Sequence, residues 1–239
     1  MPSGPSSLLG RTLSIELFTP RSTAGVQELI EGGRLDAFAA LGPSFVSVSG
    51  PTTAGSLQIL DHLRKAHSIH GQLQISRAEV SETDVVTQID TVARRGVRDV
   101  LILGDSLRSA PPSRSRSGFR SVTELVRFIK GRYGDRIRIA VCGYPQGARG
   151  ELGDYRSDVA ELAAQVRAGA ELVLCLPCFE ASTFRGFVQD ARAAGVSCPI
   201  APGVLPLVEA AEFRRICRSL SVELPESLDS SLKRATTSE

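Results

Sequence analysis

Residues 172–205, LVLCLPCFEASTFRGFVQDARAAGVSCPIAPGVL, place two apolar segments on either side of an amphipathic one. The outer segments, 172–178 and 199–205, have the length and the aliphatic content of buried strands. The segment between them, 182–195, begins with a serine, has apolar residues at helical spacing and ends with a glycine, which is typical of a capped helix. A strand, a helix and a strand in this order predict parallel strands with the helix outside.

The same alternation recurs through most of the chain. Further strands are predicted at 13–18, 45–50, 71–76, 99–105 and 139–145. Further helices are predicted at 54–67, 81–96, 121–134 and 156–170. The chain thus has seven units of a strand followed by a helix, and the predicted strands are apolar on both faces. This pattern predicts an α/β fold built on a parallel sheet. The regular spacing, and the lack of G-x-G-x-x-G after the first strand, favour a TIM-type (β/α)8-like barrel over a doubly wound sheet.

An eighth strand is not evident in this pattern, so the barrel is expected to be incomplete. After 199–205 the sequence predicts one helix, 207–220, and then a short helix with a polar tail. The gap between the first and seventh strands would stay open, or an irregular segment or another subunit would close it. Because exposed strand edges promote aggregation, we expect a tail or a partner chain, as in a homo-oligomer, to cover it. We expect a single domain over 1–239, with flexible tails at 1–11 and about 228–239.

The composition excludes several classes of protein. The chain has 239 residues, of which 42% are hydrophobic and 23% charged, as in an ordinary globular domain. The formal net charge of +2 favours neither nucleic acid nor a strongly acidic partner. No apolar run is long enough to cross a bilayer and the N-terminus does not resemble a signal peptide, so a cytoplasmic protein without membrane contact is expected.

The cysteines and histidines are assigned no chemistry. Five cysteines, an odd number in a chain without an export signal, argue against a disulfide framework. Cys175 and Cys178 form C-x-x-C within a strand-like run that has no second ligand pair, so small buried thiols are expected and a metal site is not. His62, His67 and His70 are expected on the solvated face of the helix at 54–67 and in the turn after it.

Glu16 lies within the apolar run LSIELFTP (13–20). Four of its neighbours are candidates for the core: Leu13, Ile15, Leu17 and Phe18. A carboxylate is expensive to bury alone, so Glu16 either points to water from an edge strand or is paired and functional.

Asp105 provides a second carboxylate at the end of the fourth predicted strand, directly after Gly104. In a barrel, chemistry takes place at the C-terminal ends of the strands. Glu16 and Asp105 would then face one cavity, which suits general acid catalysis and stabilisation of a cation. This arrangement favours the functional interpretation of Glu16.

Six segments, in the same order, resemble the methylenetetrahydrofolate reductase family. They are SIELFTPRSTAGVQEL (14–29), AALGPSFVSVS (39–49), RGVRDVLILGD (95–105), VCGYPQG (141–147), QVRAGAELVLCLPCFEASTFRGFVQDARAAGV (165–196) and PIAPGVLPL (199–207). The resemblance implies reduction of 5,10-methylenetetrahydrofolate to 5-methyltetrahydrofolate, in one-carbon metabolism and methionine biosynthesis. The family usually passes hydride from a nicotinamide through FAD. The resemblance further implies that Glu16 helps to protonate the folate and that Asp105 contacts the pterin and supports the developing positive charge.

Other site residues follow from the resemblance and from their places near strand ends. The expected substrate contacts are Phe18, Ser47, Gln72, Gln74, Tyr144, Gln146, Phe179 and Glu180. The expected cofactor contacts are Ser49, Gly104, Arg114, Arg116 and Asp158. The two arginines belong to SLRSAPPSRSRSGFR (106–120), which is either a solvated loop or a lid that holds nicotinamide phosphates or the glutamate tail of folate.

Departures from the family concentrate at its flavin site. SGPTTAGSLQIL (49–60) lacks the family's tyrosine and charged helix start. Gln72 and Gln74 replace a histidine and a threonine, and Gln146 replaces a glutamate. Tight binding of FAD is therefore not expected. A nicotinamide, NADH or NADPH, would pass hydride directly to the folate if it were held within about 3–3.5 Å of the acceptor carbon.

A different class of function stays open on the same grounds. Leu176 replaces a glutamine that contacts folate in the family, and Ala210 replaces an aromatic residue that stacks on the substrate. These losses favour a non-catalytic relative that binds folate or has a structural or regulatory role. Retention of both Glu16 and Asp105 favours the enzyme.

Overall fold

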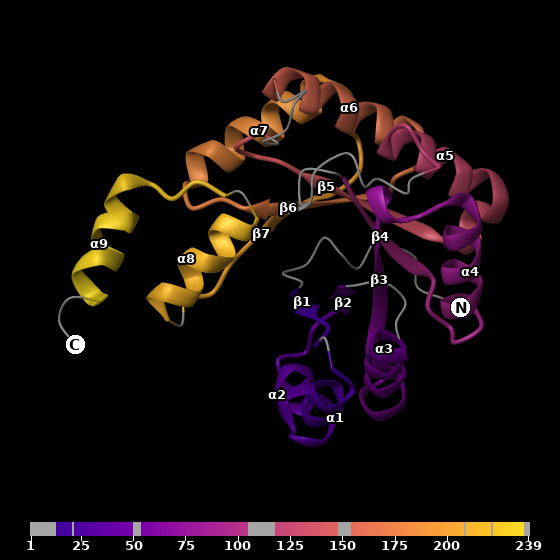
Figure 1. The fold of residues 1–239 in the computed structure, drawn as a ribbon. Helices are drawn as coiled ribbons and strands as arrows, with labels where there is room; N and C mark the ends of the chain where they lie inside the picture. Colours follow the sequence, from indigo (N-terminus) through magenta and orange to yellow (C-terminus); the bar gives the residue numbers. More distant parts are fainter. Residues whose placement is uncertain are drawn as a thin grey trace. The chain divides into compact units, whose positions relative to one another are not determined.

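The computed structural model describes residues 13–20, 22–49, 54–104, 118–147, 154–207, 209–220 and 222–236. Strands and helices alternate along the chain, as Figure 1 shows, and the strands follow chain order in the sheet. The chain forms two compact units, Met1–Ser76 with Val80–Leu101 (the first unit) and Arg77–Glu79 with Ile102–Glu239 (the second unit). Strand β4 (Asp99–Leu103) belongs to the first unit up to Leu101. The predicted α/β fold with seven strands is confirmed.

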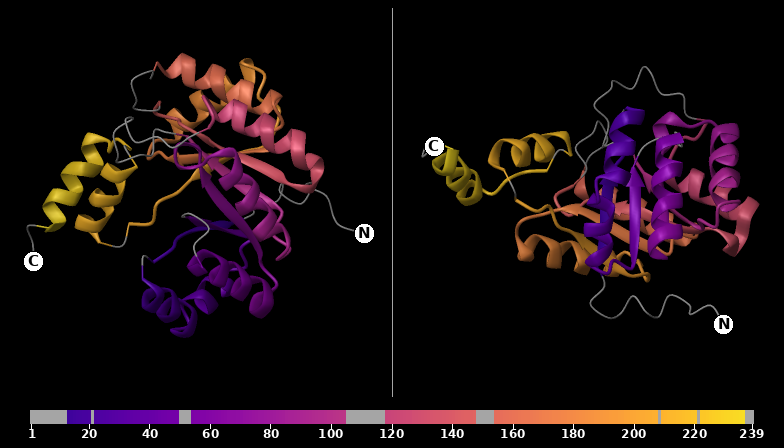
Figure 2. Two further views of the ribbon diagram at one scale, coloured as in Figure 1. Left: turned by 45° about the vertical axis from the view of Figure 1, so that its right-hand side comes forward. Right: turned by 90° about the horizontal axis from the view of Figure 1, so that it is seen from below.

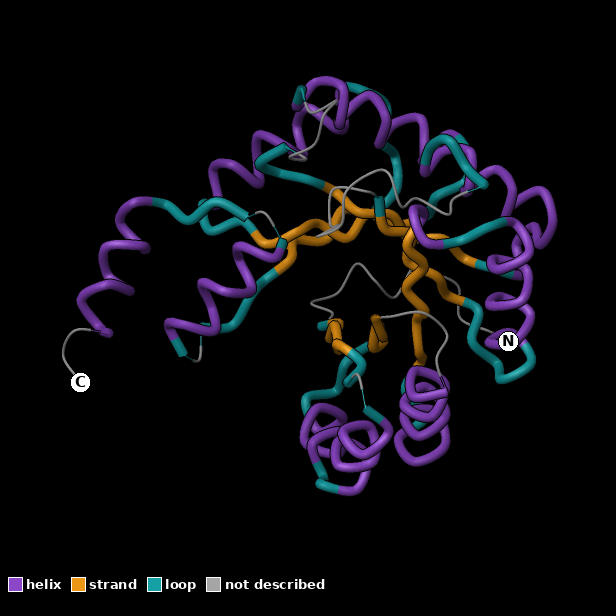
Figure 3. Tube along the Cα trace, in the orientation of Figure 1, coloured by secondary structure: helices purple, strands orange, loops and turns teal. Residues whose placement is uncertain are grey.

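The first unit contains three further strands and four helices. The strands are β1 (Ser14–Phe18), β2 (Phe45–Ser49) and β3 (His70–Ser76). The helices are α1 (Thr23–Glu31), α2 (Arg34–Ala40), α3 (Ala54–His67) and α4 (Glu82–Ala93). β2 pairs in parallel with β1 and with β3. The helices α1, α2 and α3 lie to one side of these strands in Figures 1 and 3.

One face of β1–β3 is apolar and faces the helices. Val46 and Val48 of β2 and Leu73 of β3 are fully buried, and each such side chain stabilises the fold by roughly 1.5–3 kcal/mol. Helix α3 contacts both β2 and β3. Its Leu60 comes so close to β3 that a Cβ atom at Gly71 would lie 2.4 Å from the Leu60 Cδ2 atom. Glycine at this position therefore allows the helix to pack directly on the strand.

The opposite face of the same three strands is polar. Glu16, Ser47 and Gln72 are in register across β1, β2 and β3. Side chains alternate along a strand, so Gln74 lies on the same face as Gln72. The prediction that the strands are apolar on both faces is therefore wrong here. Along these strands polar residues alternate with Ile, Leu and Val. This period of two is typical of a strand with one polar face.

Two helices of the first unit, α1 and α2, were not predicted from the sequence. Helix α1 begins after Ser22, whose hydroxyl accepts a hydrogen bond from the backbone N–H of Gly25 (3.1 Å), and ends at Gly32. Helix α2 begins after Gly33, which has φ +72°. Both helices are short and are separated by two glycines, so their apolar residues do not form a long helical period.

The second unit continues the alternation. Its complete strands are β5 (Arg138–Gly143), β6 (Leu172–Pro177) and β7 (Ile200–Gly203). Its helices are α5 (Val122–Tyr133), α6 (Tyr155–Arg167), α7 (Ala181–Ala193), α8 (Ala210–Ser219) and α9 (Glu226–Thr236), with short 3-10 turns η2 (Arg77–Glu79) and η5 (Gly134–Arg136). β6 pairs in parallel with β5 and β7, as the opening stretch of sequence predicts.

Glycines in β5 and β7 make close packing possible in the second unit. A Cβ atom at Gly143 would lie 2.8 Å from the Cys175 Sγ atom and 3.0 Å from the Cζ atom of Phe187, which is 2% exposed. A Cβ atom at Gly203 would lie 2.2 Å from the backbone oxygen of Cys175. The β6–β7 register shifts between Leu174 and Pro177, next to this approach. Gly143 thus leaves room for the ring of Phe187.

The C-terminal helices α8 and α9 lie side by side in both views of Figure 2. Phe213 and Cys217 of α8 and Leu232 of α9 are buried together. Part of the tail that was expected from about 228 forms helix α9, up to residue 236. Leu228 and Leu232 are four residues apart on one face of α9, and together with Leu224, which precedes the helix, they pack with the apolar residues of α8. The described residues that follow β7 form no eighth strand.

The prediction of small buried thiols is confirmed for Cys175, whereas Cys178 is half-buried. All five are free, and Cys142, Cys175 and Cys217 are buried. Burial raises the pKa of the Cys175 thiol, and the neighbouring Cys178 raises it further. A protonated thiol is a poor nucleophile and a poor metal ligand. Among the helices that the structure describes, none combines the length and apolar character needed to cross a bilayer.

Helix α6 is joined to α7 by a hydrogen bond from Tyr155 Oη to Asp190 Oδ2 (2.8 Å). Burial, together with this bond and the nearby carboxylate charge, raises the pKa of Tyr155 from 10.0 to about 12. The folded chain therefore retains the phenol proton over a pH range in which the unfolded chain loses it. We expect this contribution to stability to be complete below pH 10 and to be lost as the pH rises to about 12.

An ultraviolet absorbance titration of the folded protein checks this expectation. The chain has three tyrosines, so the curve of Tyr155→Phe is subtracted from that of the parent to isolate one phenol. Asp190→Asn serves as the second variant and should move the isolated titration toward lower pH. A Tyr155 titration that coincides with that of a solvated tyrosine would contradict the expectation.

Candidate functional site

The polar face of β1–β3 brings together six of the residues that the sequence analysis selected. They are Glu16 and Phe18 on β1, Ser47 and Ser49 on β2, and Gln72 and Gln74 on β3. Parallel pairing in register places these residues at adjacent positions of neighbouring strands. They share one face because the side chains of a strand alternate between its two faces. Ser47, Gln72 and Gln74 are each less than 5% exposed. We call this set the polar face.

The amide of Gln74 orients the carboxylate of Glu16. Gln74 Nε2 donates to Glu16 Oε1 (2.7 Å) and to the hydroxyl oxygen of Ser47 (3.2 Å). Both hydrogens of this amide can be used in this way, one for each acceptor. The bond to a carboxylate is charge-assisted and is the stronger of the two. Gln74, which is 58 residues from Glu16 along the chain, therefore restricts the orientation of Glu16.

The environment of Glu16 differs from the expected one. Glu16 is exposed, not partly buried, and lies on β1, the first strand in the sheet order. Of the candidate core residues around it, Leu17 is buried, whereas Leu13 and Phe18 are 47% and 62% exposed. Leu17 points to the opposite face of β1 from Glu16 because it is the next residue along the strand. The apolar neighbours therefore do not enclose the carboxylate.

Gln72 offers an unused acceptor on the polar face. Its Oε1 atom is buried and has no hydrogen-bond partner among the described residues. A buried acceptor without a partner costs roughly 1–3 kcal/mol. A ligand that donates a hydrogen bond at this point would remove that cost.

Ser49 is already engaged in hydrogen bonds that join the ends of β1 and β2. The backbone N–H of Thr19 donates to Ser49 Oγ (3.3 Å), and the Thr19 hydroxyl donates to the backbone oxygen of Ser49 (2.5 Å). The Thr19 hydroxyl also lies 3.0 Å from that of Ser56 on α3. Thr19 was not among the predicted site residues; its position directly after an apolar run was the only signal in the sequence.

Four further predicted residues lie in loops or at helix starts of the second unit. A Cβ atom at Gly104 would lie 3.1 Å from the Tyr144 hydroxyl, so these two positions are adjacent. Gln146 donates through Nε2 to the backbone oxygen of Glu223 (3.1 Å) and accepts from its N–H (3.0 Å). Asp158 lies in the first turn of α6. Both polar ends of the Gln146 amide are thus used to hold the segment between α8 and α9.

Two more predicted residues lie after β6. The ring of Phe179 packs against Phe213 of α8, with 5.4 Å between centroids, and belongs to the apolar cluster of the C-terminal helices. Glu180 precedes α7, where its carboxylate accepts from the Thr183 hydroxyl (3.4 Å). Phe179 therefore has a packing role in addition to any contact with a substrate.

Three predicted residues lie outside the described residues: Asp105, Arg114 and Arg116. The approach of Asp105 to Glu16 and the lid formed by the two arginines stay predictions. The geometry of the candidate site rests on the polar face, where Gln74 positions Glu16 and where Gln72 Oε1 has no hydrogen-bond partner among the residues that the structure describes.

A comparison with protein-family models matches residues 9–239 to "Methylenetetrahydrofolate reductase". The match covers nearly the whole chain. The chain belongs to the methylenetetrahydrofolate reductase family. The resemblance of the six segments is thereby confirmed.

Curated relatives in the methylenetetrahydrofolate reductase family are similar over most of this chain. "Methylenetetrahydrofolate reductase (NADH) 1" of Zea mays is 29% identical, over 93% of this chain and 40% of that protein. "Probable methylenetetrahydrofolate reductase (NADPH)" of Caenorhabditis elegans is 28% identical, over 90% of this chain and 33% of that protein. The chain thus spans 40% or less of the length of these two reductases.

A solved structure supports the fold of this member of the reductase family. It is described as an uncharacterized protein from Clostridium thermocellum that binds two copies of 5-methyl-5,6,7,8-tetrahydrofolic acid. The TM-score is 0.69 at 9% identity, and the match covers 93% of this chain and 75% of that chain. The likeness extends over nearly the whole α/β chain, in agreement with an incomplete TIM-type barrel.

Two of the predicted site residues, Ser49 and Gln146, are engaged in hydrogen bonds within the chain. Ser49, an expected cofactor contact, already bonds to Thr19 through its hydroxyl and its backbone oxygen. Gln146, at a position of the family's flavin site, uses both ends of its amide on Glu223.

Proposed function

We propose that this protein reduces 5,10-methylenetetrahydrofolate to 5-methyltetrahydrofolate with NADH or NADPH. The observation that carries the proposal is the polar face, where Gln74 orients Glu16 at 2.7 Å and Gln72 Oε1 is buried without a partner among the described residues. Membership of the reductase family supports it over nearly the whole chain. The nicotinamide cofactor is supported by the similar proteins of Zea mays and Caenorhabditis elegans, which are named as an NADH and a probable NADPH reductase.

Glu16 has the role of proton donor in this proposal. A proton passed to N10 of the folate breaks the bond between N10 and the methylene carbon, which leaves an iminium cation at N5. The cation then accepts hydride at that carbon and becomes the 5-methyl group, while the nicotinamide is oxidised. Gln74 positions the donor, and proton transfer from a positioned side chain accelerates a reaction by roughly 10²–10⁴-fold.

The remaining groups bind and stabilise the folate. Gln72 accepts a hydrogen bond from the pterin edge, and Phe18, which is 62% exposed, offers its ring to the substrate. Asp105 stabilises the iminium cation by its negative charge, as the family resemblance implies. We propose direct transfer of hydride from the nicotinamide, without a tightly bound flavin, since Ser49 and Gln146 are engaged within the chain.

Folate binding without reduction is the alternative function. It is favoured by the similar Clostridium thermocellum protein, which is described as binding 5-methyl-5,6,7,8-tetrahydrofolic acid. It also agrees with Ala210, which begins α8 and packs beside Phe213, a place where the family has a ring for the substrate. In this case Glu16 would contribute only to binding.

The experiment that separates these functions uses the purified full chain. A protein without visible flavin absorbance that oxidises NADH or NADPH only when 5,10-methylenetetrahydrofolate is present is the expected result, with 5-methyltetrahydrofolate identified as the product. A yellow protein that loses activity when its flavin is removed would reject direct transfer. A colourless, inactive protein that binds 5-methyltetrahydrofolate would establish the alternative.

A further inference from the structure

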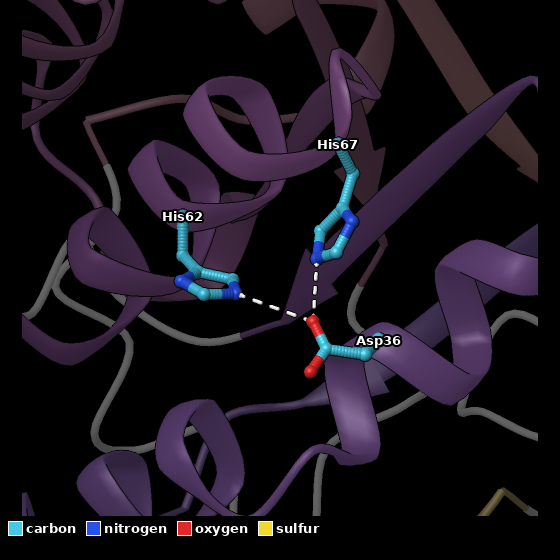
Figure 4. A group of neighbouring side chains, drawn as sticks. All are labelled: Asp36, His62 and His67. Atoms are coloured by element: carbon cyan, nitrogen blue, oxygen red, sulfur yellow. Dashed lines mark ion pairs between the residues drawn. The ribbon is translucent and has the colours of Figure 1, made fainter.

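Three side chains of the first unit converge outside the polar face. They are Asp36 of α2 and His62 and His67 of α3. His67 Nε2 lies 2.9 Å from Asp36 Oδ1, and His62 Nε2 lies 4.0 Å from the same oxygen. Figure 4 shows both imidazoles directed at this one carboxylate oxygen. One ligand atom from each residue lies within 4.8 Å of the other two.

The two imidazoles are not on a solvated face, contrary to the prediction. The side chains of His62 and His67 are 25% and 19% exposed. Both Nε2 atoms are buried, and neither makes a hydrogen bond of good geometry to a described residue. His67 and Asp36 thus lie at an ion-pair distance but do not form a well-directed hydrogen bond. Two buried nitrogens that point at one carboxylate oxygen are suited to share a partner that accepts electron pairs, such as a metal cation.

We propose that Asp36, His62 and His67 form a binding site for a divalent transition metal ion of the zinc type. Tetrahedral zinc has ligands at about 2.0–2.2 Å, which places the ligand atoms roughly 3.2–3.5 Å from one another. The distances of 2.9 and 4.0 Å to Asp36 Oδ1 lie on either side of that range, so small rotations of the side chains complete the geometry. Two imidazoles and one carboxylate leave a fourth position for water.

The choice of metal follows from the ligands. Imidazole nitrogen suits zinc and its neighbours in the first transition row, whereas Mg²⁺ and Ca²⁺ prefer sites made of oxygen. The free cysteines are weaker competitors, since burial raises the pKa of both Cys175 and Cys178. The His–Asp cluster is therefore the favoured zinc site among the described residues.

The fold supplies a favourable field for a cation at this place. His67 is the last residue of α3, where the helix dipole is negative and favours positive charge. Asp36 is in the first turn of α2, where a carboxylate is favoured for the converse reason. Helix α2 contacts α3, so the ion would join the two helices. The site is independent of the proposed reductase function.

The test is metal binding by the full chain, purified without a histidine tag and treated with a chelator. Calorimetry with Zn²⁺ should give one equivalent, and the melting temperature should rise by roughly 5–10 °C at about 100 times the dissociation constant. His62→Gln, His67→Gln and Asp36→Asn should each weaken Zn²⁺ binding more than about 10-fold. His70→Gln, an exposed histidine three residues beyond α3, is the matched control and should bind as the parent does.

Two further measurements prevent an ambiguous result. Melting of each variant in chelator separates loss of a ligand from loss of the fold. Co²⁺ should give the visible spectrum of a four-coordinate ion without thiolate charge-transfer bands. Absence of Zn²⁺ binding, binding that survives His67→Gln, or thiolate bands would each overturn the proposal.

Discussion

Glu16→Gln is expected to lower kcat/KM for reduction of 5,10-methylenetetrahydrofolate by roughly 10²–10⁴-fold, since the carboxyl is the proposed proton donor. The substitution preserves the size of the side chain and an oxygen that can accept from Gln74 Nε2. Because Glu16 is exposed on a strand at the end of the sheet order, the free energy of unfolding should change by less than about 1 kcal/mol. The loss should therefore appear in chemistry and not in folding.

Steady-state kinetics with the parent, Glu16→Gln and a matched control make this test specific. Glu31→Gln makes the same chemical change at an exposed position of α1, where Glu31 accepts a surface bond from Gln27. It should retain parental kinetics. Gln74→Leu removes the group that positions Glu16 and should lower kcat with a changed pH profile. Parental activity in Glu16→Gln would remove the proposed role of this carboxylate.

Phe187→Ala is expected to destabilise the second unit by about 3–5 kcal/mol. The ring is 2% exposed and lies over Gly143 of β5, beside Cys175 of β6. Its removal leaves a cavity between α7 and the sheet that the strands cannot collapse to fill. Urea unfolding measures the change, and Phe18→Ala, at a ring that is 62% exposed, should cost less than about 0.5 kcal/mol.

A second substitution tests the geometry behind this prediction. Gly143→Ala alone places a methyl group 3.0 Å from the Phe187 Cζ atom and 2.8 Å from the Cys175 Sγ atom, so it should cost about 1–3 kcal/mol. In the double variant the ring is absent and part of the overlap disappears. The double variant should therefore lose less free energy of unfolding than the two single variants lose in sum. Strict additivity would show that the two positions do not meet.

Local patterns in the sequence were sufficient to predict most of the elements. The predicted helix at 54–67 coincides with α3, and the predicted strands agree with β1 to β7 to within a few residues. Strand and helix periods, serine caps and terminal glycines are properties of a few consecutive residues, so they can be read without the fold. Helices α1 and α2 were missed because their short length and the glycines at 32 and 33 hide the helical period.

The contacts that define the candidate sites were not predictable in the same way. Gln74 meets Glu16 across 58 positions of sequence because β1, β2 and β3 pair in a particular register. His62 and His67 are five residues apart, about 140° around a helix, so their spacing does not suggest a shared ligand. Asp36 joins them from α2, a helix that was not predicted.

By itself, the sequence determined the α/β class, the order of the strands and the family, because backbone periodicity and ordered motifs are local. Only the tertiary structure decided that Glu16 is exposed, that Gln74 holds it and that Gln146 and Phe179 are engaged by the C-terminal segments. Such pairings depend on strand register and on how helices pack, and these are set by the burial of apolar surface over the whole unit.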